Sequence, residues 1–563
     1  MLFKLFLIIV SILFQHNSTA VLVEEELFAG TVADFTAVDP IVFRDGVKLR
    51  TQQYDSTQLN NPDFVGSFEH EDYVYFFFRE AAVEYINCGK AVFSRVSRVC
   101  KNDKGGSKKS FRYAWTSFLK TRLNCSVPGD YPFHFNEIQG VSKLVRGRYG
   151  VNHDNPNNEI DNRNKHRSSG KYGQEENGVE YVLYATFTTP ANSIGGSAVC
   201  AFRLKDIADA FNGKFKEQRD MNANWQSVPE HKVPSPRPGS CMNDTKTLPD
   251  SSLNFIKTHT IMDETVSAFF GAPIVVRTGI LSSRFTAIAV DPQIMTTAGK
   301  AYDIIFIGTT RGRVLKVINA KSAHSKEDVK TVVIEELQLF SPNTIIKELK
   351  VMNDLRGGGQ KSLGRLAVMS ENEIRSFSVQ RCDRATSCEE CVALQDPYCA
   401  WDVRSLRCSS GDWTANMAES FIQSIEQGVH AFCPSKHFAK HNYIKGGMQS
   451  LAIDSAEASE VLYTYQYLYN EPPPPLGEVI NIIDDNDKKS IENMQKNKKN
   501  DNFLNKEKNK NVDGTSYEPA SSAMVFSLET LIITVSAGAV AALVVGFVTG
   551  YCCGRRCNKG NQQ

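Results

Sequence analysis

The sequence predicts an all-β ectodomain, then a small disulfide-rich module, an extracellular stalk and one membrane-spanning helix. Three observations predict this order. Short strand-like runs fill the chain from about Val21 to Gln380, six cysteines lie within the 52 residues from Cys382 to Cys433, and Leu531–Tyr551 is apolar and uncharged. The formal net charge is +1 over 563 residues, so the chain lacks the basic excess that nucleic-acid binding favours.

The strand-like runs are rich in Val, Ile, Phe and Tyr and are separated by Gly, Asn, Asp and Pro. Convincing helical periodicity is scarce. Repeated four-strand groups over a segment of this length suit a propeller better than a sandwich. Residues 151–178 are strongly polar and predict a long solvated loop. The clearest runs are Tyr73–Phe78, Ala91–Val99, Tyr181–Phe187, Phe285–Val290, Tyr302–Ile307, Val314–Ile318 and Leu366–Met369.

The six clustered cysteines predict a disulfide framework. A module of this size cannot bury enough apolar surface to stay folded without cross-links. The alternative for Cys388-Glu-Glu-Cys391 is a zinc site or a redox dithiol, but no matching His or second close Cys pair follows it. The spacing alone leaves the pairing of the six cysteines open.

The apolar run near the C-terminus predicts a single-pass topology. Its 21 residues would extend about 31 Å as a helix, which matches one bilayer core. Arg555, Arg556 and Lys559 follow it, so by the positive-inside rule that end is cytoplasmic. We therefore expect a type I protein of the plasma membrane with an extracellular N-terminus. The 12 residues after Tyr551 leave no room for an intracellular catalytic domain.

These patterns divide the chain into six segments. Lys4, the apolar run Leu5–Phe14 and Ser18-Thr19-Ala20 together read as a signal peptide cleaved after Ala20. A run of Pro472–Pro475 and a Lys/Asn/Asp-rich stretch over 481–513 predict a disordered stalk. The predicted segments are an apolar leader or signal-like segment (1–15), the strand-rich domain (16–380), the cysteine module (381–434), the stalk (435–523), the membrane helix region (524–551) and a short cytoplasmic tail (552–563).

Several ordered motifs carry a family resemblance from His16 to about Cys433. They are the segment Val74–Gly106, Trp115–Ser126, Ala185–Pro190, Gly195–Phe202, Arg237-Pro-Gly-Ser-Cys241, Phe306–Lys316 and Asp396-Pro-Tyr-Cys-Ala-Trp-Asp402. The first six resemble the sema domain of semaphorins, most closely the invertebrate transmembrane class 1. The last, with its cysteines, is similar to the plexin–semaphorin–integrin module. The resemblance implies a seven-bladed β-propeller ligand that plexin receptors recognise in axon guidance.

Two departures from the family pattern shape the expectation. In the family, a segment similar to His16–Val23 lies inside the propeller, after about two blades, so about five blades are expected here. Ser18–Ala20 then belongs to the segment shared with the family and is not a cleavage site. The cytoplasmic tail is also shorter than is usual in the family. An open ring leaves blade faces and strand edges unpaired, so we expect the chain alone to fold poorly or aggregate.

The resemblance also implies a cysteine pairing. It pairs Cys100 with Cys241, Cys125 with Cys200, Cys382 with Cys399, Cys388 with Cys433, and Cys391 with Cys408. Of the eleven cysteines before the membrane run, Cys88 is then left over. Semaphorins act as dimers, so an interchain disulfide through Cys88 is expected; the alternative is a buried core thiol.

Surface features complete the expectation. Asn124-Cys-Ser and Asn243-Asp-Thr are glycosylation sequons, and Asn17-Ser-Thr is a third if no cleaved leader includes it. The basic loop Lys101–Lys109 could meet an acidic receptor face or sulfated glycans, although a solvated turn explains it as well.

The sequence carries no pattern of an enzyme. It has no nucleophile elbow, no His-Glu-x-x-His, no phosphate loop and no metal-ligand spacing, so neither a catalytic residue nor a cofactor is predicted. The leading hypothesis is a membrane-tethered semaphorin guidance ligand that binds a plexin receptor, with A-type plexins favoured, and forms a homodimer. The alternatives are a plexin-like receptor ectodomain and a non-functional truncated gene product.

Overall fold

The computed structural model is mostly β. It describes residues 17–34, 38–86, 89–107, 111–150, 179–220, 223–279, 283–352, 364–411, 413, 417 and 420–433. The chain divides into two compact units, Met1–Gly447 and Met448–Gln563, and the second lies wholly outside the described residues. The polar loop 151–178, the stalk, the membrane helix region, the tail and Cys88 also lie outside them. Among the described residues, no helix combines the length and apolar character that a bilayer crossing requires.

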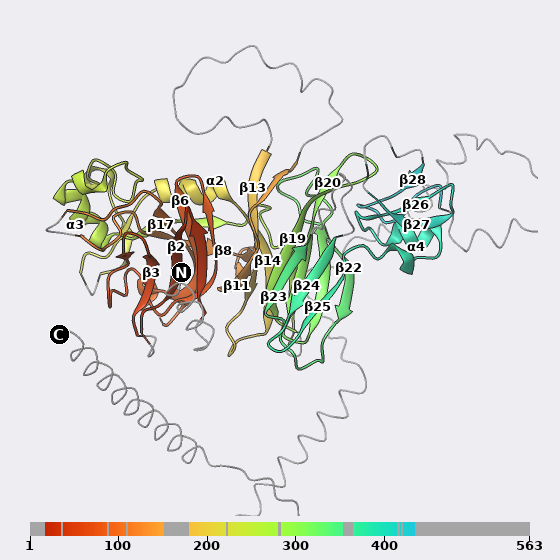
Figure 1. Cartoon of the computed structure of the whole chain (residues 1–563), viewed down its shortest axis with the longest axis horizontal. Helices are drawn as coiled ribbons and strands as arrows, with labels where there is room; N and C mark the ends of the chain where they lie inside the picture. Colours follow the sequence, from red (N-terminus) through yellow and green to blue (C-terminus); the bar gives the residue numbers. More distant parts are fainter. Residues whose placement is uncertain are drawn as a thin grey trace, which may run out of the picture. The chain divides into compact units, whose positions relative to one another are not determined.

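Five successive sheets make up the strand-rich domain in the described part of the chain (Figure 1). Sheet 1 contains β1 (Thr19–Val23), β2 (Glu26–Val32), β3 (Pro40–Arg44) and β4 (Leu49–Arg50). Sheet 2 contains β5 (Asp63–His70), β6 (Tyr73–Ala81), β7 (Val92–Cys100) and β8 (Leu119–Asn124), joined by β17 (Ile261–Ser267). Sheet 3 contains β11 (Glu137–Val141), β12 (Val145–Arg148), β13 (Val179–Thr188), β14 (Gly196–Arg203) and β18 (Val275–Thr278).

Sheets 4 and 5 follow in the same order. Sheet 4 contains β19 (Phe285–Met295), β20 (Ala301–Thr309), β21 (Arg313–Asn319) and β22 (Thr331–Gln338). Sheet 5 contains β23 (Glu348–Met352), β24 (Arg365–Met369) and β25 (Ile374–Ser378). Neighbouring strands in sheets 1, 4 and 5 are antiparallel, as successive hairpins require. Gly312, with φ of +67°, supplies the left-handed position in the connection between β20 and β21.

The first strands of the five sheets lie around a common cavity. Strand β5 contacts β1 and β11, and β19 contacts β11 and β23. Together with Ser18, just before β1, residues of β5, β11, β19 and β23 line a cavity of about 500 Å³. First strands that gather around one channel are the arrangement of a propeller, in which each sheet is a blade.

Successive sheets pack against each other through buried apolar side chains. Phe28 and Val42 of sheet 1 pack against Phe64 and Phe76 of sheet 2 in one buried cluster. Leu315 of sheet 4 packs against Tyr184 of sheet 3, and Leu349 of sheet 5 packs against the other face of sheet 4. Central strands such as β6 are buried on both faces, which explains the unbroken apolar run Val74–Phe78.

Each of the seven strand-like runs coincides with a strand, so these predictions are confirmed. Two α-helices in the described part of the domain, α2 (Leu204–Asn212) and α3 (Asp250–Thr258), were missed. They belong to a long connection between β14 and β17 that also holds two short strands, β15 (Lys216–Glu217) and β16 (Gln226–Ser227), and two 3₁₀ turns, η3 (Glu230–Lys232) and η4 (Thr245–Thr247). Strand β17 then returns to sheet 2 parallel to β8.

The cysteine module is a small three-stranded sheet with one helix. Its elements are η5 (Cys382–Arg384), α4 (Cys388–Ala393), β26 (Cys399–Asp402), β27 (Arg407–Ser410) and β28 (Phe421–Ile422). The Ser387 hydroxyl caps α4 by accepting a hydrogen bond from the Glu390 N–H. Trp401 packs among Cys391, Cys433 and Ile422, so an aromatic ring and disulfides supply the core.

Candidate interaction surfaces

One end of sheet 2 carries a turn whose orientation toward solvent is inverted. The 3₁₀ turn η1 (Val83–Tyr85) lies in the connection from β6 to β7. At the base of this connection the Ala82 N–H donates a hydrogen bond to the Ala91 carbonyl at 2.8 Å. The charged side chain of Glu84 points inward and is 6% exposed. Ile86 is 61% exposed, and Tyr85 is 45% exposed with its ring packed edge-on against Phe93, 5.2 Å between the ring centres. The usual preference of charges for water and apolar groups for the core is reversed here.

A buried group of four charges holds this turn. We call Glu80, Glu84, Arg95 and Lys120 the Glu84 cluster. Both carboxylate oxygens of Glu84 accept hydrogen bonds from Arg95 Nη2 at 2.6 Å. Arg95 Nε donates to Glu80 at 3.1 Å, and Lys120 Nζ donates to the same oxygen at 2.5 Å. Two acids and two bases make the cluster neutral, which a buried group of charges requires.

Burial and neighbouring charges act in opposite directions on the ionisable groups of the cluster. Burial works to raise the pKa of Glu84, but the Arg95 guanidinium lowers it more through charge and hydrogen bonds, so the pKa lies below the usual range. Burial lowers the pKa of Lys120 against the opposing effect of Glu80.

A second exposed apolar group lies beyond the end of strand β8. Strands β9 (Ser126–Val127) and β10 (Phe133–His134) pair as a hairpin, with Phe133 opposite Val127. Tyr131, in its loop, is 96% exposed, and Val127 and Phe133 are also exposed. The guanidinium of Arg122 lies between these two regions, 3.8 Å from the centre of the Phe93 ring in β7 and 3.3 Å from the side chain of Asn136, which follows the hairpin.

The five disulfides of the structure are the pairs that the resemblance implies. Two lie in the strand-rich domain, Cys100–Cys241 and Cys125–Cys200, with Cα–Cα distances of 5.2 and 5.8 Å. The first joins Cys100, at the end of β7, to Cys241, which follows η3 in the long connection between β14 and β17. The second joins sheets 2 and 3. Three lie in the cysteine module: Cys382–Cys399, Cys388–Cys433 and Cys391–Cys408. No group of His, Cys, Asp and Glu suited to a metal ion occurs within the described ranges.

The three sequons differ in how their side chains are held. Asn243 is exposed, whereas the Thr245 hydroxyl of its sequon is buried and donates to the Gly105 carbonyl at 2.7 Å. Asn124 is partly buried at the end of β8, where its Oδ1 is 2.9 Å from His134 Nδ1. Asn17 is exposed, and its amide donates to Asp63 at 3.1 Å.

The basic loop that begins at Lys101 is partly neutralised. Lys101 pairs with Glu69 at 3.1 Å. Asp103 is buried and accepts hydrogen bonds from Gly105 N–H and Thr116 N–H, each at 2.8 Å. These contacts favour a structured turn over a free cationic patch at the described part of this loop, residues 101–107.

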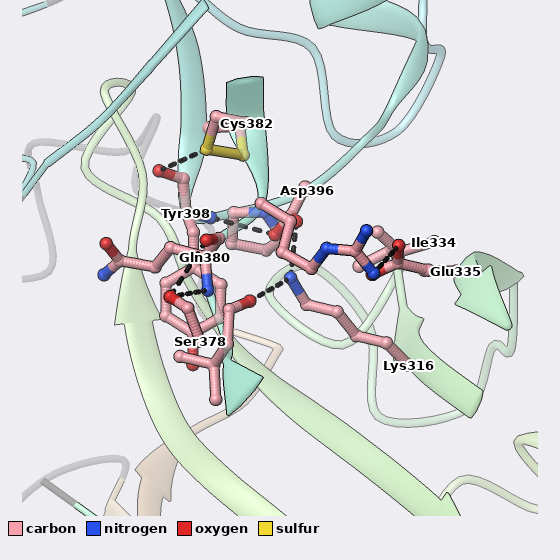
Figure 2. Close-up of polar contacts among 12 residues, drawn as sticks. Lys316, Ile334, Glu335, Ser378, Gln380, Cys382, Asp396 and Tyr398 are labelled. Atoms are coloured by element: carbon pink, nitrogen blue, oxygen red, sulfur yellow. Dashed lines mark hydrogen bonds and ion pairs between the residues drawn. A yellow bond between two sulfur atoms is a disulfide. The ribbon is translucent and has the colours of Figure 1, made fainter. Parts of the chain in front are cut away.

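The junction between sheet 4 and the cysteine module contains a buried ion pair. Lys316 Nζ, from β21, bonds the Asp396 carboxylate and also donates to the Val379 carbonyl at 3.0 Å. Figure 2 shows Lys316 reaching Asp396 beside Tyr398. The Lys316 ammonium lies 4.5 Å from the centre of the Tyr398 ring, and the Tyr398 hydroxyl donates to Asp291 of β19.

Weaker polar contacts surround this pair. Glu335 of β22 bonds Arg381 at 2.8 Å and Arg384 at 3.1 Å. On another side of the module, the Glu426 carboxylate lies 2.5 Å from His324 Nε2. Side chains from three strands of sheet 4 therefore hold the cysteine module.

The sequence identified the cysteines and sequons but missed the Glu84 cluster and the Lys316–Asp396 pair. Each missed contact joins residues from different elements, and Lys316 and Asp396 are 80 positions apart. The available signal was a basic residue inside an apolar strand-like run, Lys316 in Val314–Ile318 and Arg95 in Ala91–Val99, because a charge in a buried strand needs a partner.

Comparisons with known proteins define the class. A Sema domain matches residues 165–353, and a Plexin repeat matches residues 381–434. The chain is 45% identical to Semaphorin-1A of Drosophila melanogaster over 97% of its own length, and it spans about half (54%) of that relative.

Two solved structures extend the likeness. The extracellular domains 1–2 of Drosophila Semaphorin 1a are 51% identical, with a TM-score of 0.63, over 74% of this chain and 76% of that chain. A structure described as Drosophila Plexin A in complex with Semaphorin 1b matches at 42% identity and a TM-score of 0.62, over 73% of each chain.

This chain belongs to the semaphorin family. Its strand-rich domain is a sema domain and its cysteine module is the plexin repeat that follows. The family consists of signalling ligands rather than enzymes, and the relatives are class 1 invertebrate semaphorins.

Proposed function

We propose that this protein is a membrane-tethered guidance ligand that binds plexin receptors, with A-type plexins as the favoured partners. The observation that carries the proposal is its 42% identity, over 73% of the chain, to a structure of Plexin A in complex with Semaphorin 1b. The five sheets correspond to about five blades of a seven-bladed sema propeller, followed by the plexin repeat. Axon guidance and neurogenesis are the proposed biological setting.

The proposed topology is single-pass type I at the plasma membrane. The uncharged run Leu531–Tyr551 and the basic residues after it support this orientation. The disulfides and sequons support an extracellular sema domain, because disulfides persist in oxidising compartments. The proposed glycosylation sites are Asn124 and Asn243, together with Asn17 where the mature chain retains it.

The proposed assembly is a homodimer with an interchain disulfide through Cys88. Five disulfides use ten of the eleven cysteines that precede the membrane run, and Cys88 is the remaining one. A symmetric disulfide requires a residue close to a two-fold axis, with Cα atoms within about 7 Å. A covalent dimer would also raise the avidity for paired receptors without any new contact.

A cell-binding experiment tests the ligand proposal. Cells that display the full-length chain with an N-terminal tag should bind a soluble A-type plexin ectodomain in proportion to the surface tag. Cells that display an unrelated type I protein at the same tag level are the control. If plexin binding does not exceed this control, the proposed partner is wrong.

A non-reducing gel tests the covalent dimer. Wild-type chain extracted with a thiol-alkylating agent should run as a dimer that reductant separates, and Cys88→Ser should run as a monomer. A wild-type monomer without reductant, or a Cys88→Ser dimer that survives denaturation, would refute the link.

A further inference from the structure

We propose that a cavity between sheets 3 and 4 binds a sulfated glycan chain. The cavity holds about 350 Å³ and lies between the paired strands β12 and β13 of sheet 3 and the β19–β20 hairpin of sheet 4. It shares no lining residue with the central cavity of the propeller. Arg146, Arg148 and Lys300 line it, and none of its described lining residues is acidic. A cleft with one sign of charge concentrates ligands of the opposite charge.

Two of these cations, Arg148 and Lys300, have no carboxylate partner within the described ranges. Arg146 and Arg148 are exposed and lie on one face of β12, with Cα atoms about 7 Å apart because they are two positions apart on a strand. Lys300 belongs to the facing hairpin, and its Nζ lies 2.9 Å from His324 Nε2. The Glu426 carboxylate contacts that imidazole rather than Lys300. The charges of Arg148 and Lys300 therefore remain available to an anion.

Contacts beneath the cavity fix the strand that carries the arginines. The Arg148 N–H donates to Gln293 Oε1 at 3.0 Å, and Gln293 Nε2 donates to the Asp303 carboxylate at 2.9 Å. Asp303 is 4% exposed and also accepts hydrogen bonds from the hydroxyls of Tyr149 and Tyr184, each at 2.5 Å. This acid is thus bonded in the interior and does not reach the cations at the rim. The backbone of the site is in place before a ligand arrives, which lowers the ordering cost of binding.

The remaining surface of the cavity selects among anions. Val179, Met295 and Ala301 lie in its wall, so apolar surface lies among the cations. Tyr181, which is 37% exposed, pairs with Arg146 across β13 and β12 and extends this surface beyond the cavity. A sugar ring has an apolar face that such a wall covers, and its sulfate groups accept charge-assisted hydrogen bonds from guanidinium and ammonium groups. A small inorganic anion would leave the apolar wall uncovered.

The size and setting of the cavity agree with this ligand. A volume of about 350 Å³ falls within the usual range of ligand pockets, about 300–1,000 Å³. A linear glycan would place one sulfated segment in the cavity and continue over the exposed surface at Arg146 and Tyr181. Sulfated glycans are extracellular, so the biological role of the site rests on the proposed topology, whereas binding itself requires neither the topology nor the plexin receptor.

The test measures the affinity of the full-length chain, purified in neutral detergent and immobilised by a C-terminal tag, for a heparin-derived octasaccharide. Arg148→Gln and Lys300→Gln should each raise the Kd about fivefold, and the double variant about 25-fold, because each loses one charge-assisted contact. The control is Arg404→Gln/Arg407→Gln, which removes two exposed cations from the cysteine module and should leave the Kd within about twofold. If Lys300→Gln shifts the urea unfolding midpoint, Arg148→Gln, which changes an exposed side chain, decides alone.

Competition identifies the chemical class of the ligand. Three competitors are used: the same octasaccharide without its sulfate groups, a poly-glutamate peptide, and glycerophosphoserine as a soluble lipid headgroup. Each should displace the labelled octasaccharide at least about tenfold less well than the unlabelled sulfated form. Equal displacement by the peptide or the headgroup would assign the cavity to an acidic protein or a lipid surface and overturn the proposal.

Two further outcomes would also overturn it. One is the absence of binding at physiological salt, and the other is an equal loss of affinity in the cavity variants and the control variant. Because the assay uses purified chain and a different probe from the cell-binding experiment, its failure would leave the proposed topology and the proposed plexin partner standing.

Discussion

Replacing Lys316 by Met should destabilise the junction between sheet 4 and the cysteine module. The variant keeps most of the apolar stem and removes the ammonium. Asp396 is then left 2% exposed with a charge, and of its described contacts the hydrogen bond from Tyr398 N–H remains, at 3.1 Å. The Val379 carbonyl also loses its donor.

The structure sets the size of the effect. Breaking a buried ion pair by removing one partner costs about 3–5 kcal/mol, because the other charge stays buried without compensation. The double variant Lys316→Met/Asp396→Leu removes both charges, so its free energy of unfolding should lie within about 2 kcal/mol of wild type. Lys326→Met is a matched control, since its 2.8 Å pair with Glu180 lies nearer the surface and should be worth about 0–1 kcal/mol.

Pulse proteolysis of the full-length chain over a urea series measures these differences as shifts in the unfolding midpoint. The expected order of stability is wild type, then Lys326→Met and the double variant, and then Lys316→Met well below them. If Lys316→Met shifts the midpoint no further than Lys326→Met, the junction does not depend on the buried pair, and the reasoning fails.

Three further predictions follow from the cysteines, the sequons and the buried carboxylate. Cys388→Ser removes the bridge to Cys433 and should cost roughly 2–5 kcal/mol, measured by the same proteolysis; an unchanged midpoint and unchanged secretion would contradict the framework. Asn243→Gln should lose one glycan, seen as a faster mobility than wild type that disappears when both chains are deglycosylated; unchanged mobility would show that the sequon is unused. Glu84 has a lowered pKa in the folded chain, so its stabilisation is complete above its ordinary value of 4.5 and is lost as pH falls through the folded value. Wild type should therefore lose more stability than Glu84→Gln between about pH 5 and about pH 3, and equal losses would contradict the assignment.

The parts of the fold that local patterns encode were predictable. Tyr73–Phe78 and Tyr302–Ile307 are β-branched and aromatic runs bounded by turn residues, and each lies inside a strand. Helix α2 was missed although Leu204, Ile207 and Phe211 lie at helical spacing, because strands surround it on both sides in the sequence. The parallel pairing of β17 with β8 has no local signal, since the two strands are more than a hundred positions apart.

The candidate site was predictable only in its covalent part. The cysteines are visible in the sequence, so their spacing indicated a disulfide framework. The family resemblance supplied the pairing. The direction in which Glu84 points depends on where Arg95 lies across sheet 2, and no periodicity of the turn reports this. A carboxylate in a loop is normally solvated, so the sequence offered no reason to expect Glu84 to be buried.

The two buried ion contacts solve the same physical problem. Apolar packing holds one blade against the next, and many small rotations of a sheet preserve it almost equally well. A short turn and a small module have little apolar surface with which to fix an orientation. Arg95 holds the turn through Glu84, and Lys316 holds the cysteine module through Asp396. Such contacts add little net stability but penalise every other orientation, because a displaced partner leaves a charge buried alone. On this reasoning, variants of either pair should alter the geometry of the attached segment even where the propeller itself remains folded.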